Sequence, residues 1–278
     1  MKLLDKYLVG FGIWLTGLYL LGLLLSWSVG LEEVWTRLLF TVWTLFFIVL
    51  GFPVKLPKIN WWASSLLVLG LVLTLPLALI GDHIMGADAH REYYCFVQTD
   101  IANEIFVRSG YLITGCLSIT LLPTFFQDIT GVEHETLFRL LYPCVFSVFP
   151  VVIYSLCRFF TKSLYAFAAG VVVALQPLFI WTTASARTSM GTLFIALVLL
   201  VLLCDIKGWQ KSILVTVLGI GCLLSHYTSA FVMLAILVGA LVPKTTRWPT
   251  ILPLILLAFG THMWLNHVGL NWITTRYF

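Results

Sequence analysis

The sequence predicts an all-α integral membrane protein with about nine transmembrane helices. Of the 278 residues, 60% are hydrophobic and only 10% are charged, and the mean hydropathy is +1.02. A soluble domain carries about 25% charged residues, and a helix needs about 20 apolar residues to cross the hydrocarbon core of a bilayer. The long apolar runs lack the alternation of barrel strands, so helices are the expected spans.

The apolar runs define nine candidate spans and one interrupted apolar segment. The spans cover residues 7–28, 37–53, 62–80, 139–157, 163–181, 189–204, 212–225, 227–242 and 249–266. Because Gly115 and Pro123 interrupt the segment 109–126, we expect a re-entrant or interfacial hairpin there. The chain then divides into a three-span segment at 1–80, an outer loop at 81–138 and a six-span segment at 139–278, which together form one membrane domain.

The lysine residues determine the expected orientation. With the N-terminus in the cytoplasm, every lysine lies on the cytoplasmic side, whereas a full span at 109–126 would move all lysines from Lys162 onward to the outside. We therefore expect a multi-pass protein of the cell membrane with an extracytoplasmic C-terminus. An odd number of spans suits continuation into an outer C-terminal soluble domain or association with a partner subunit.

In this orientation the six histidines and ten of the twelve acidic residues fall on the outer side. The richest stretch is 86–94, where Asp88 and Glu92 share one face of a helix, or Asp88, His90 and Glu92 share one face of a strand. A carboxylate there could act as a general base. The three side chains could instead bind a divalent cation, with oxygen ligands favouring Mg²⁺ or Mn²⁺ and His90 favouring Zn²⁺. In the third interpretation, Asp88 pairs with Arg91 or Arg187 in a solvated loop and has no further role.

Two further outer residues lie at the membrane edge. Arg187 lies between the fifth and sixth spans, where a charge at membrane depth costs about 2.5–3.5 kcal/mol and calls for an anionic partner such as a lipid phosphate. Simple snorkelling to the interface is the alternative. His226 and Tyr227 form the short turn between the seventh and eighth spans, where the imidazole could donate to a phosphate or a sugar hydroxyl, or cap a helix.

Several classes of function lack their sequence signals. The chain has no HExxH, GxSxG or Walker A motif. It has no basic block with interleaved aromatic residues, so no nucleic-acid partner is expected. Asp205 is the only acidic residue between the fourth and ninth spans, and it lies at a cytoplasmic edge. An ion-coupled transporter favours an acid near mid-membrane, so a lipid or small-solute transporter ranks third among the hypotheses.

The order of motifs resembles that of an archaeal multi-pass family of unknown function, which in turn resembles the GT-C superfamily of membrane glycosyltransferases. The resemblance runs from about Gly86 to Ala230. The motifs that carry it are GADAHREYY, GCLSITLLPTFF, LLYPCVFSVFPVVIYSL, the Gln176-Pro177 pair, Arg187 and SHYTSAF. The sequence departs from most GT-C enzymes in having three spans, instead of one, before the acidic outer loop.

The resemblance implies a GT-C-like glycosyltransferase that transfers a hexosyl or pentosyl group from a polyprenyl-phosphate donor on the outer face. In that case Asp88 would be the catalytic base or a metal ligand, supported by Glu92 and His90. The donor would be held by residues at the outer membrane edge, namely Arg187, His226, Tyr227, Arg91 and His90. The alternative from another class is a non-catalytic membrane subunit or lipid-binding scaffold with the same fold.

Overall fold

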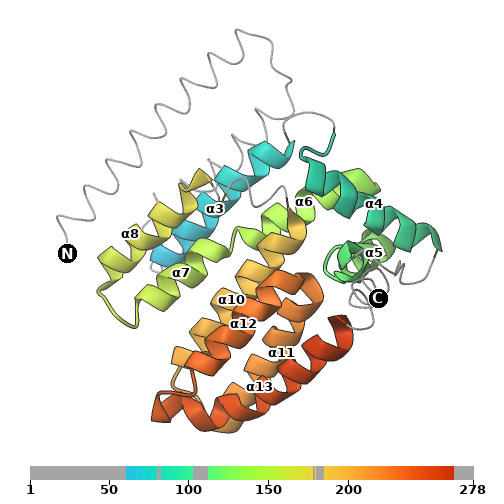
Figure 1. Ribbon diagram of the computed structural model, residues 1–278. Coiled ribbons are helices and arrows are strands. Elements are labelled where there is room, and N and C mark those ends of the chain that lie inside the picture. Colours follow the sequence, from blue (N-terminus) through green and yellow to red (C-terminus); the bar gives the residue numbers. More distant parts are fainter. Residues whose placement is uncertain (1–60, 80–82, 103–111, 178, 180–184, 266–278) are drawn as a thin grey trace, which may run out of the picture.

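The computed structural model of the protein describes residues 61–79, 83–102, 112–177, 179 and 185–265. The expected spans at 7–28 and 37–53 lie outside these residues, as do the start of the expected hairpin at 109–111 and the C-terminal residues 266–278. The described residues form helices and their connections, without a β-strand (Figure 1). The predicted all-α class is therefore confirmed for the described part of the chain.

The helices follow one another along the chain with short connections. They are α3 (Trp61–Leu79), α4 (Ala87–Ala102), the 3-10 helix η1 (Leu112–Gly115), α5 (Leu121–Thr130), α6 (His134–Phe146), α7 (Phe149–Cys157), α8 (Ser163–Ala174), α10 (Ala186–Leu203), α11 (Gly208–Ser225), α12 (Tyr227–Gly239) and α13 (Lys244–Leu265).

Within the described residues, three helical stretches are long and apolar enough to cross a membrane. They are His134–Cys157, which joins α6 and α7, and the helices α10 and α11. Shorter apolar stretches occur at Trp61–Leu75 in α3, in α8 and in α12. The structure thus supports helices suited to a membrane, while the total of nine spans stays a prediction.

The predicted span 139–157 is divided into two helices by a turn at Ser147 and Val148. Pro150 has no backbone N–H with which to bond the carbonyl of Phe146, and its ring crowds that carbonyl. Helix α6 accordingly ends at Phe146, and Pro150 lies in the first turn of α7, where a missing N–H costs nothing. A proline inside the apolar run therefore accounts for the interruption of the helix.

The expected hairpin segment is interrupted, as predicted, but not at both expected residues. The 3-10 helix η1 ends at Gly115, a turn follows, and α5 begins at Leu121. Pro123 lies in the first turn of α5, so it begins that helix instead of breaking it. Residues 112–126 therefore do not form one straight helix, and their insertion into the membrane stays a prediction.

Several helix boundaries differ from the apolar runs because polar residues extend the helices and prolines end them. The expected span 163–181 is helical in α8 only to Ala174, just before Gln176 and Pro177, where proline disfavours continued helix. Helix α10 begins at Ala186, three residues before the expected start, so Arg187 lies inside its first turn. Helices α11 and α13 likewise begin before the expected residues 212 and 249.

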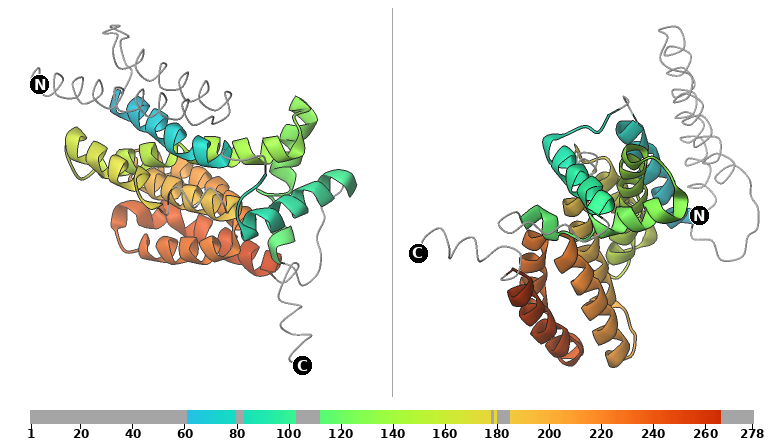
Figure 2. Two further views of the ribbon diagram at one scale, coloured as in Figure 1. Left: turned by 90° about the horizontal axis from the view of Figure 1, so that it is seen from above. Right: turned by 90° about the vertical axis from the view of Figure 1, so that its right-hand side faces the viewer.

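Helices α10 to α13 form a packed group in which successive helices run in opposite directions (Figures 1 and 2). At one end of this group, Lys211 Nζ donates to the Leu202 carbonyl oxygen at 3.0 Å, which satisfies a carbonyl in the last turn of α10. At the same end, Ser212 Oγ donates to the Pro249 carbonyl oxygen at 2.7 Å. The Arg187 end of α10 and the α11–α12 turn therefore lie together at the opposite end.

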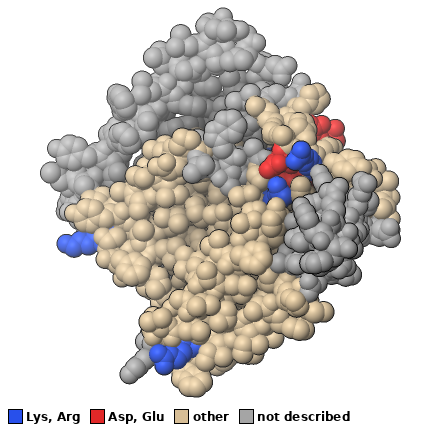
Figure 3. Space-filling model, in the orientation of Figure 1, with Lys and Arg blue, Asp and Glu red and all other residues tan. Residues whose placement is uncertain are grey.

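Charged side chains lie at the two ends of the described helices, with an uncharged surface between them. Helices α4 and α5 lie at one end, and the α7–α8, α10–α11 and α12–α13 connections lie at the other (Figures 1 and 2). On the face in Figure 3, acidic and basic side chains lie side by side at the α4 end, and a broad surface without charge separates them from further basic side chains at the other edges. This separation fits helices that cross a membrane; the end that faces the cytoplasm stays a prediction.

Helix α3 packs against the turn between α6 and α7 through a glycine. A Cβ added at Gly70 would overlap the backbone carbonyl oxygen of Ser147, so only a residue without a side chain permits this approach. One turn further along, Thr74 Oγ1 donates to the carbonyl oxygens of Gly70 at 2.9 Å and Pro143 at 3.3 Å. Close approach through small residues is typical of helices that pack in a membrane.

We expect Gly70→Ala to lower the free energy of unfolding by about 1–3 kcal/mol, because the new methyl group must push α3 away from a backbone carbonyl that cannot rotate aside. The measurement is thermal unfolding in detergent micelles followed by tryptophan fluorescence. Gly239→Ala is the matched control, since a Cβ at this helical position meets nothing within 4 Å. Equal melting temperatures for the two variants would contradict the close contact.

Candidate functional site

The acidic helix α4 is held against α6 by aromatic side chains. Phe96 of α4 is fully buried and lies 6.2 Å from the ring of Phe138 on α6, which in turn lies 4.9 Å from the ring of Tyr142. The Tyr142 hydroxyl donates to the Ser118 carbonyl oxygen at 2.8 Å, which ties the turn before α5 to the same cluster. This packing fixes the face of α4 that carries the site residues.

The stretch 86–94 is helical, which decides between the two arrangements that the sequence left open. Gly86 has φ +105°, a backbone conformation that favours glycine, and its carbonyl accepts the first helical hydrogen bond of α4 from the His90 N–H at 3.1 Å. Asp88 lies in the first turn, where a negative charge is favourable. Asp88 and Glu92 therefore share one face, and the exposed His90 lies on another.

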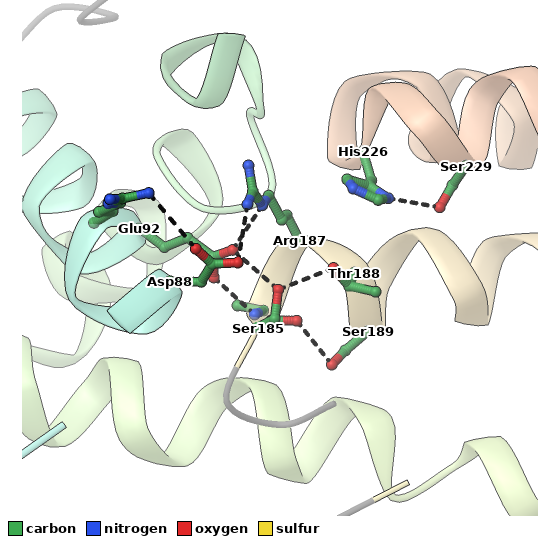
Figure 4. Close-up of polar contacts among 10 residues, drawn as sticks. Asp88, Glu92, Ser185, Arg187, Thr188, Ser189, His226 and Ser229 are labelled. Carbon is green, nitrogen blue, oxygen red and sulfur yellow. Dashed lines mark hydrogen bonds and ion pairs between the residues drawn. The ribbon is translucent and has the colours of Figure 1, made fainter. Parts of the chain in front are cut away.

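Glu92 connects α4 to the start of α10. Its side chain is fully buried, and its Oε2 accepts the Ala186 backbone N–H at 2.7 Å (Figure 4). Its Oε1 accepts the Ser185 hydroxyl at 3.3 Å and lies 2.9 Å from Arg187 Nε in an ion pair. Burial raises the pKa of Glu92 to about 7, although Arg187 and these hydrogen bonds oppose the rise. Glu92 thus caps the first turn of α10 from a distant part of the chain.

Arg187 is the cation at the centre of the site. It lies in the first turn of α10 and is only 8% exposed. A positive charge is unfavourable at a helix N-terminus, but its Nη2 donates to Asp88 Oδ2 at 3.3 Å and its Nε faces Glu92. Its buried Nη1 has no hydrogen-bond partner in the part of the chain that the structure describes. Arg187 therefore forms ion pairs with two carboxylates, while its Nε and its buried Nη1 make no hydrogen bond among the described residues.

The two carboxylates that face Arg187 differ sharply in exposure. The Asp88 side chain is 51% exposed and makes one further long contact, 4.0 Å from Arg91 Nη1. An exposed ion pair is worth about 0–1 kcal/mol, whereas breaking a buried pair by removing one partner costs about 3–5 kcal/mol. We conclude that Glu92 holds Arg187 in place and that Asp88 is free to move and to contact other molecules.

His226 lies beside the same face of α10, one helical turn beyond Arg187. A Cβ added at Gly191 would approach the Cβ of His226 to 2.9 Å, so the two residues are direct neighbours. His226 Nδ1 shares a hydrogen bond with Ser229 Oγ at 2.8 Å (Figure 4). Burial and the charge of Arg187 lower the pKa of His226, which favours a neutral imidazole. Tyr227 follows in the same turn, with its ring centroid 5.2 Å from that of His226.

The predicted cation ligands do not converge on one point. Glu92 is fully engaged by α10, His90 is exposed on a different face, and Arg187 occupies the space between Asp88 and Glu92. Among the described residues there is no group of three or more His, Cys, Asp or Glu side chains arranged to hold a metal. The divalent cation stays a prediction from the sequence, and Arg187 is the cation that the structure places between the carboxylates.

Sequence reasoning missed several contacts that define this region. Ser185 precedes α10, and its hydroxyl contacts both Glu92 and Thr188, the latter at 2.9 Å. A serine directly before a helix is a recognised N-cap signal. The apolar run begins only at 189, so the sequence did not indicate that a helix starts directly after Ser185. His134 Nε2 lies 2.6 Å from Asp100 Oδ2 and joins the far part of α4 to α6; no local spacing indicates this pair.

The chain matches no protein-family model, no curated protein and no solved structure.

We expect Arg187→Gln to lower the free energy of unfolding by about 3–5 kcal/mol at pH 8, because the buried Glu92 carboxylate loses its cation. Arg187→Gln combined with Glu92→Gln removes both charges and should recover most of this loss. Arg91→Gln is the control, since Arg91 is 62% exposed and contacts Asp88 only at 4.0 Å; its effect should stay within about 0.5 kcal/mol.

Thermal unfolding in detergent micelles gives the three comparisons under one condition. If the double variant were as unstable as Arg187→Gln alone, the buried charge on Glu92 would not be the cause of the loss.

Proposed function

We propose that the protein is a membrane glycosyltransferase of the GT-C type that transfers a sugar from a polyprenyl-phosphate donor on the extracytoplasmic face. The observation that carries this proposal is the half-exposed Asp88 carboxylate held 3.3 Å from Arg187 at one end of apolar helices. An acid that can accept a proton and a cation that can receive a phosphate lie side by side at the level where apolar helices end. The motif order that resembles GT-C enzymes supports the same function.

The proposed reaction gives Asp88 and Arg187 separate roles. Asp88 accepts the proton of an acceptor hydroxyl, whose oxygen attacks the anomeric carbon of the sugar. The bond between that carbon and the phosphate oxygen breaks, and its electron pair leaves with the polyprenyl phosphate. Arg187, and His226 beside it, stabilise the negative charge that develops on the leaving phosphate. Glu92 takes no part in proton transfer, since it is fully buried, and keeps Arg187 in position.

Helix α5 supports an outer surface that contacts lipid. Leu121, Phe125 and Ile129 repeat every four residues along α5 and are 45%, 58% and 66% exposed. The same stripe would normally face a protein core, yet here the buried residue of α5 is Pro123. An apolar stripe on a short helix next to membrane-length helices is typical of an interfacial helix. We propose that α5 lies in the outer membrane interface, as the interrupted segment of a hairpin.

A non-catalytic lipid-binding subunit is the second candidate, and one observation favours it. Asp88 and Glu92 of α4 both face Arg187, so this cluster satisfies its own charges without a substrate. In that case the Asp88–Arg187 pair serves only to join α4 to α10, and its loss should reduce stability and leave no activity to lose.

We expect Asp88→Asn to abolish sugar transfer while it changes the melting temperature little, because an exposed ion pair is worth about 0–1 kcal/mol. The assay supplies hexosyl or pentosyl polyprenyl phosphates to membranes that contain the protein, and measures the release of polyprenyl phosphate. Asp128→Asn, an exposed acid on α5, is the matched control and should keep full activity. Full activity in Asp88→Asn would contradict the proposed base, whereas a marked fall in stability with no transfer by the unaltered protein would favour the scaffold.

We expect a photoreactive benzoylphenylalanine in place of Phe125 to crosslink to phospholipid in reconstituted vesicles. The same residue in place of Thr130, which is exposed on another face of α5, should crosslink much less. Mass spectrometry of the crosslinked protein measures the lipid adducts. Equal lipid adducts at the two positions would exclude a lipid-facing stripe on α5.

A further inference from the structure

We propose that Asp88 is an exchangeable occupant of the Arg187 guanidinium and that a lipid-linked phosphate displaces it on binding. The exchange releases the Asp88 carboxylate at the moment when the donor arrives. This inference rests on the proposed function for the identity of the phosphate ligand and for the role of the released carboxylate. The exchange itself is a property of the Asp88–Arg187–Glu92 cluster.

An incoming anion cannot displace the two carboxylates from Arg187 with equal ease. Glu92 is fully buried and is held by the Ala186 N–H, the Ser185 hydroxyl and Arg187, so an incoming anion would have to break three contacts. Asp88 is half-exposed and is held to Arg187 by a single 3.3 Å contact to Nη2. Only Asp88 can leave Arg187 without disturbing the start of α10. The position that it vacates opens toward solvent, because half of the Asp88 side chain is already exposed.

Arg187 is equipped to bind more than the Asp88 carboxylate. Its side chain is nine-tenths buried, and its Nη1 has no hydrogen-bond partner within the described ranges. Asp88 uses Nη2 alone. A phosphate presents three oxygens and can take two guanidinium N–H groups at once, a geometry that arginine favours strongly. A phosphate can therefore bond the Nη1 group that Asp88 leaves unused. For this reason it should displace Asp88 from Arg187.

The surroundings of Arg187 add to the preference for an anion. Arg187 lies in the first turn of the 18-residue helix α10, where the helix dipole favours negative charge, although Glu92 already accepts the Ala186 N–H there. His226 lies one turn along the same face, next to Gly191. Arg91 is the other positive side chain close to Asp88, at 4.0 Å, and can hold the released carboxylate near the site. The base would thus be held back until a phosphate is bound.

The exchange predicts that removal of the Asp88 charge tightens phosphate binding. The probes are dodecyl phosphate and inorganic phosphate, each titrated into the full-length protein in dodecyl maltoside micelles, with affinity read from microscale thermophoresis. Asp88→Asn keeps the shape of the side chain and removes the competing anion, so dodecyl phosphate should bind about threefold to fivefold more tightly than to the unaltered protein. Asp128→Asn removes an equal charge from an exposed site on α5 and should leave the affinity unchanged.

Substitution of Arg187 tests whether the ligand uses the same cation. Arg187→Lys keeps a positive charge beside Glu92, so the chain can still fold, but it lacks the planar fork and should weaken dodecyl phosphate binding at least about tenfold. In the Arg187→Lys background, addition of Asp88→Asn should give much less tightening than it gives with Arg187 present.

Each outcome decides a specific point. Equal affinity of the unaltered protein and Asp88→Asn for both probes would overturn the exchange, even if Asp88→Asn abolishes sugar transfer. Tightening for dodecyl phosphate alone supports a lipid-linked ligand. Equal tightening for inorganic phosphate would overturn the lipid-linked ligand and leave a site for free phosphate. Tightening together with full transfer by Asp88→Asn would overturn the proposed base and support the exchange.

Discussion

The contact of the buried Glu92 carboxylate with the N-terminus of α10 is the interaction on which the α4 end of the molecule depends. It accepts the Ala186 N–H at 2.7 Å and lies 2.9 Å from Arg187 Nε. The first turn of a helix has unsatisfied N–H groups, and a cation is unfavourable there. The Glu92 carboxylate accepts one of these N–H groups and neutralises the charge of Arg187. Because residues 92 and 186 are far apart in sequence, this contact also fixes α4 against the helices that follow it.

The remaining packing at this end places α4 where Glu92 can reach. Phe96, Phe138 and Tyr142 join α4 to α6, and a turn after Phe146, followed by Pro150 in the first turn of α7, ends α6 below this cluster. At the other end, Lys211 closes the last turn of α10. Polar side chains thus satisfy both ends of α10, while its middle is apolar. This is the arrangement that a helix needs when lipid surrounds it and no water is present to bond its backbone.

The two carboxylates facing Arg187 divide structural and chemical tasks by their exposure. Glu92 is engaged on both oxygens and fully buried, so it holds the cation. Asp88 is half-exposed and weakly held, so it can accept a proton or give way to a phosphate. Helical spacing predicted that both residues share one face, but spacing alone could not tell which of the two is buried. Only their depth against α10 distinguishes them, and depth depends on residues that lie about a hundred positions away in sequence.

The sequence by itself determined the helical membrane class, because its apolar runs are long enough to cross a bilayer. In lipid, backbone groups must bond within their own segment, so such runs form helices. It also identified Asp88, Arg187 and His226, since polar residues are conspicuous in an apolar chain. Tertiary structure alone decided which of them meet. The pairing of Glu92 with Ala186, the bond of His134 to Asp100 and the contact of Gly70 with Ser147 all join distant segments. Local periodicity carries no information about such contacts, because packing between helices sets them.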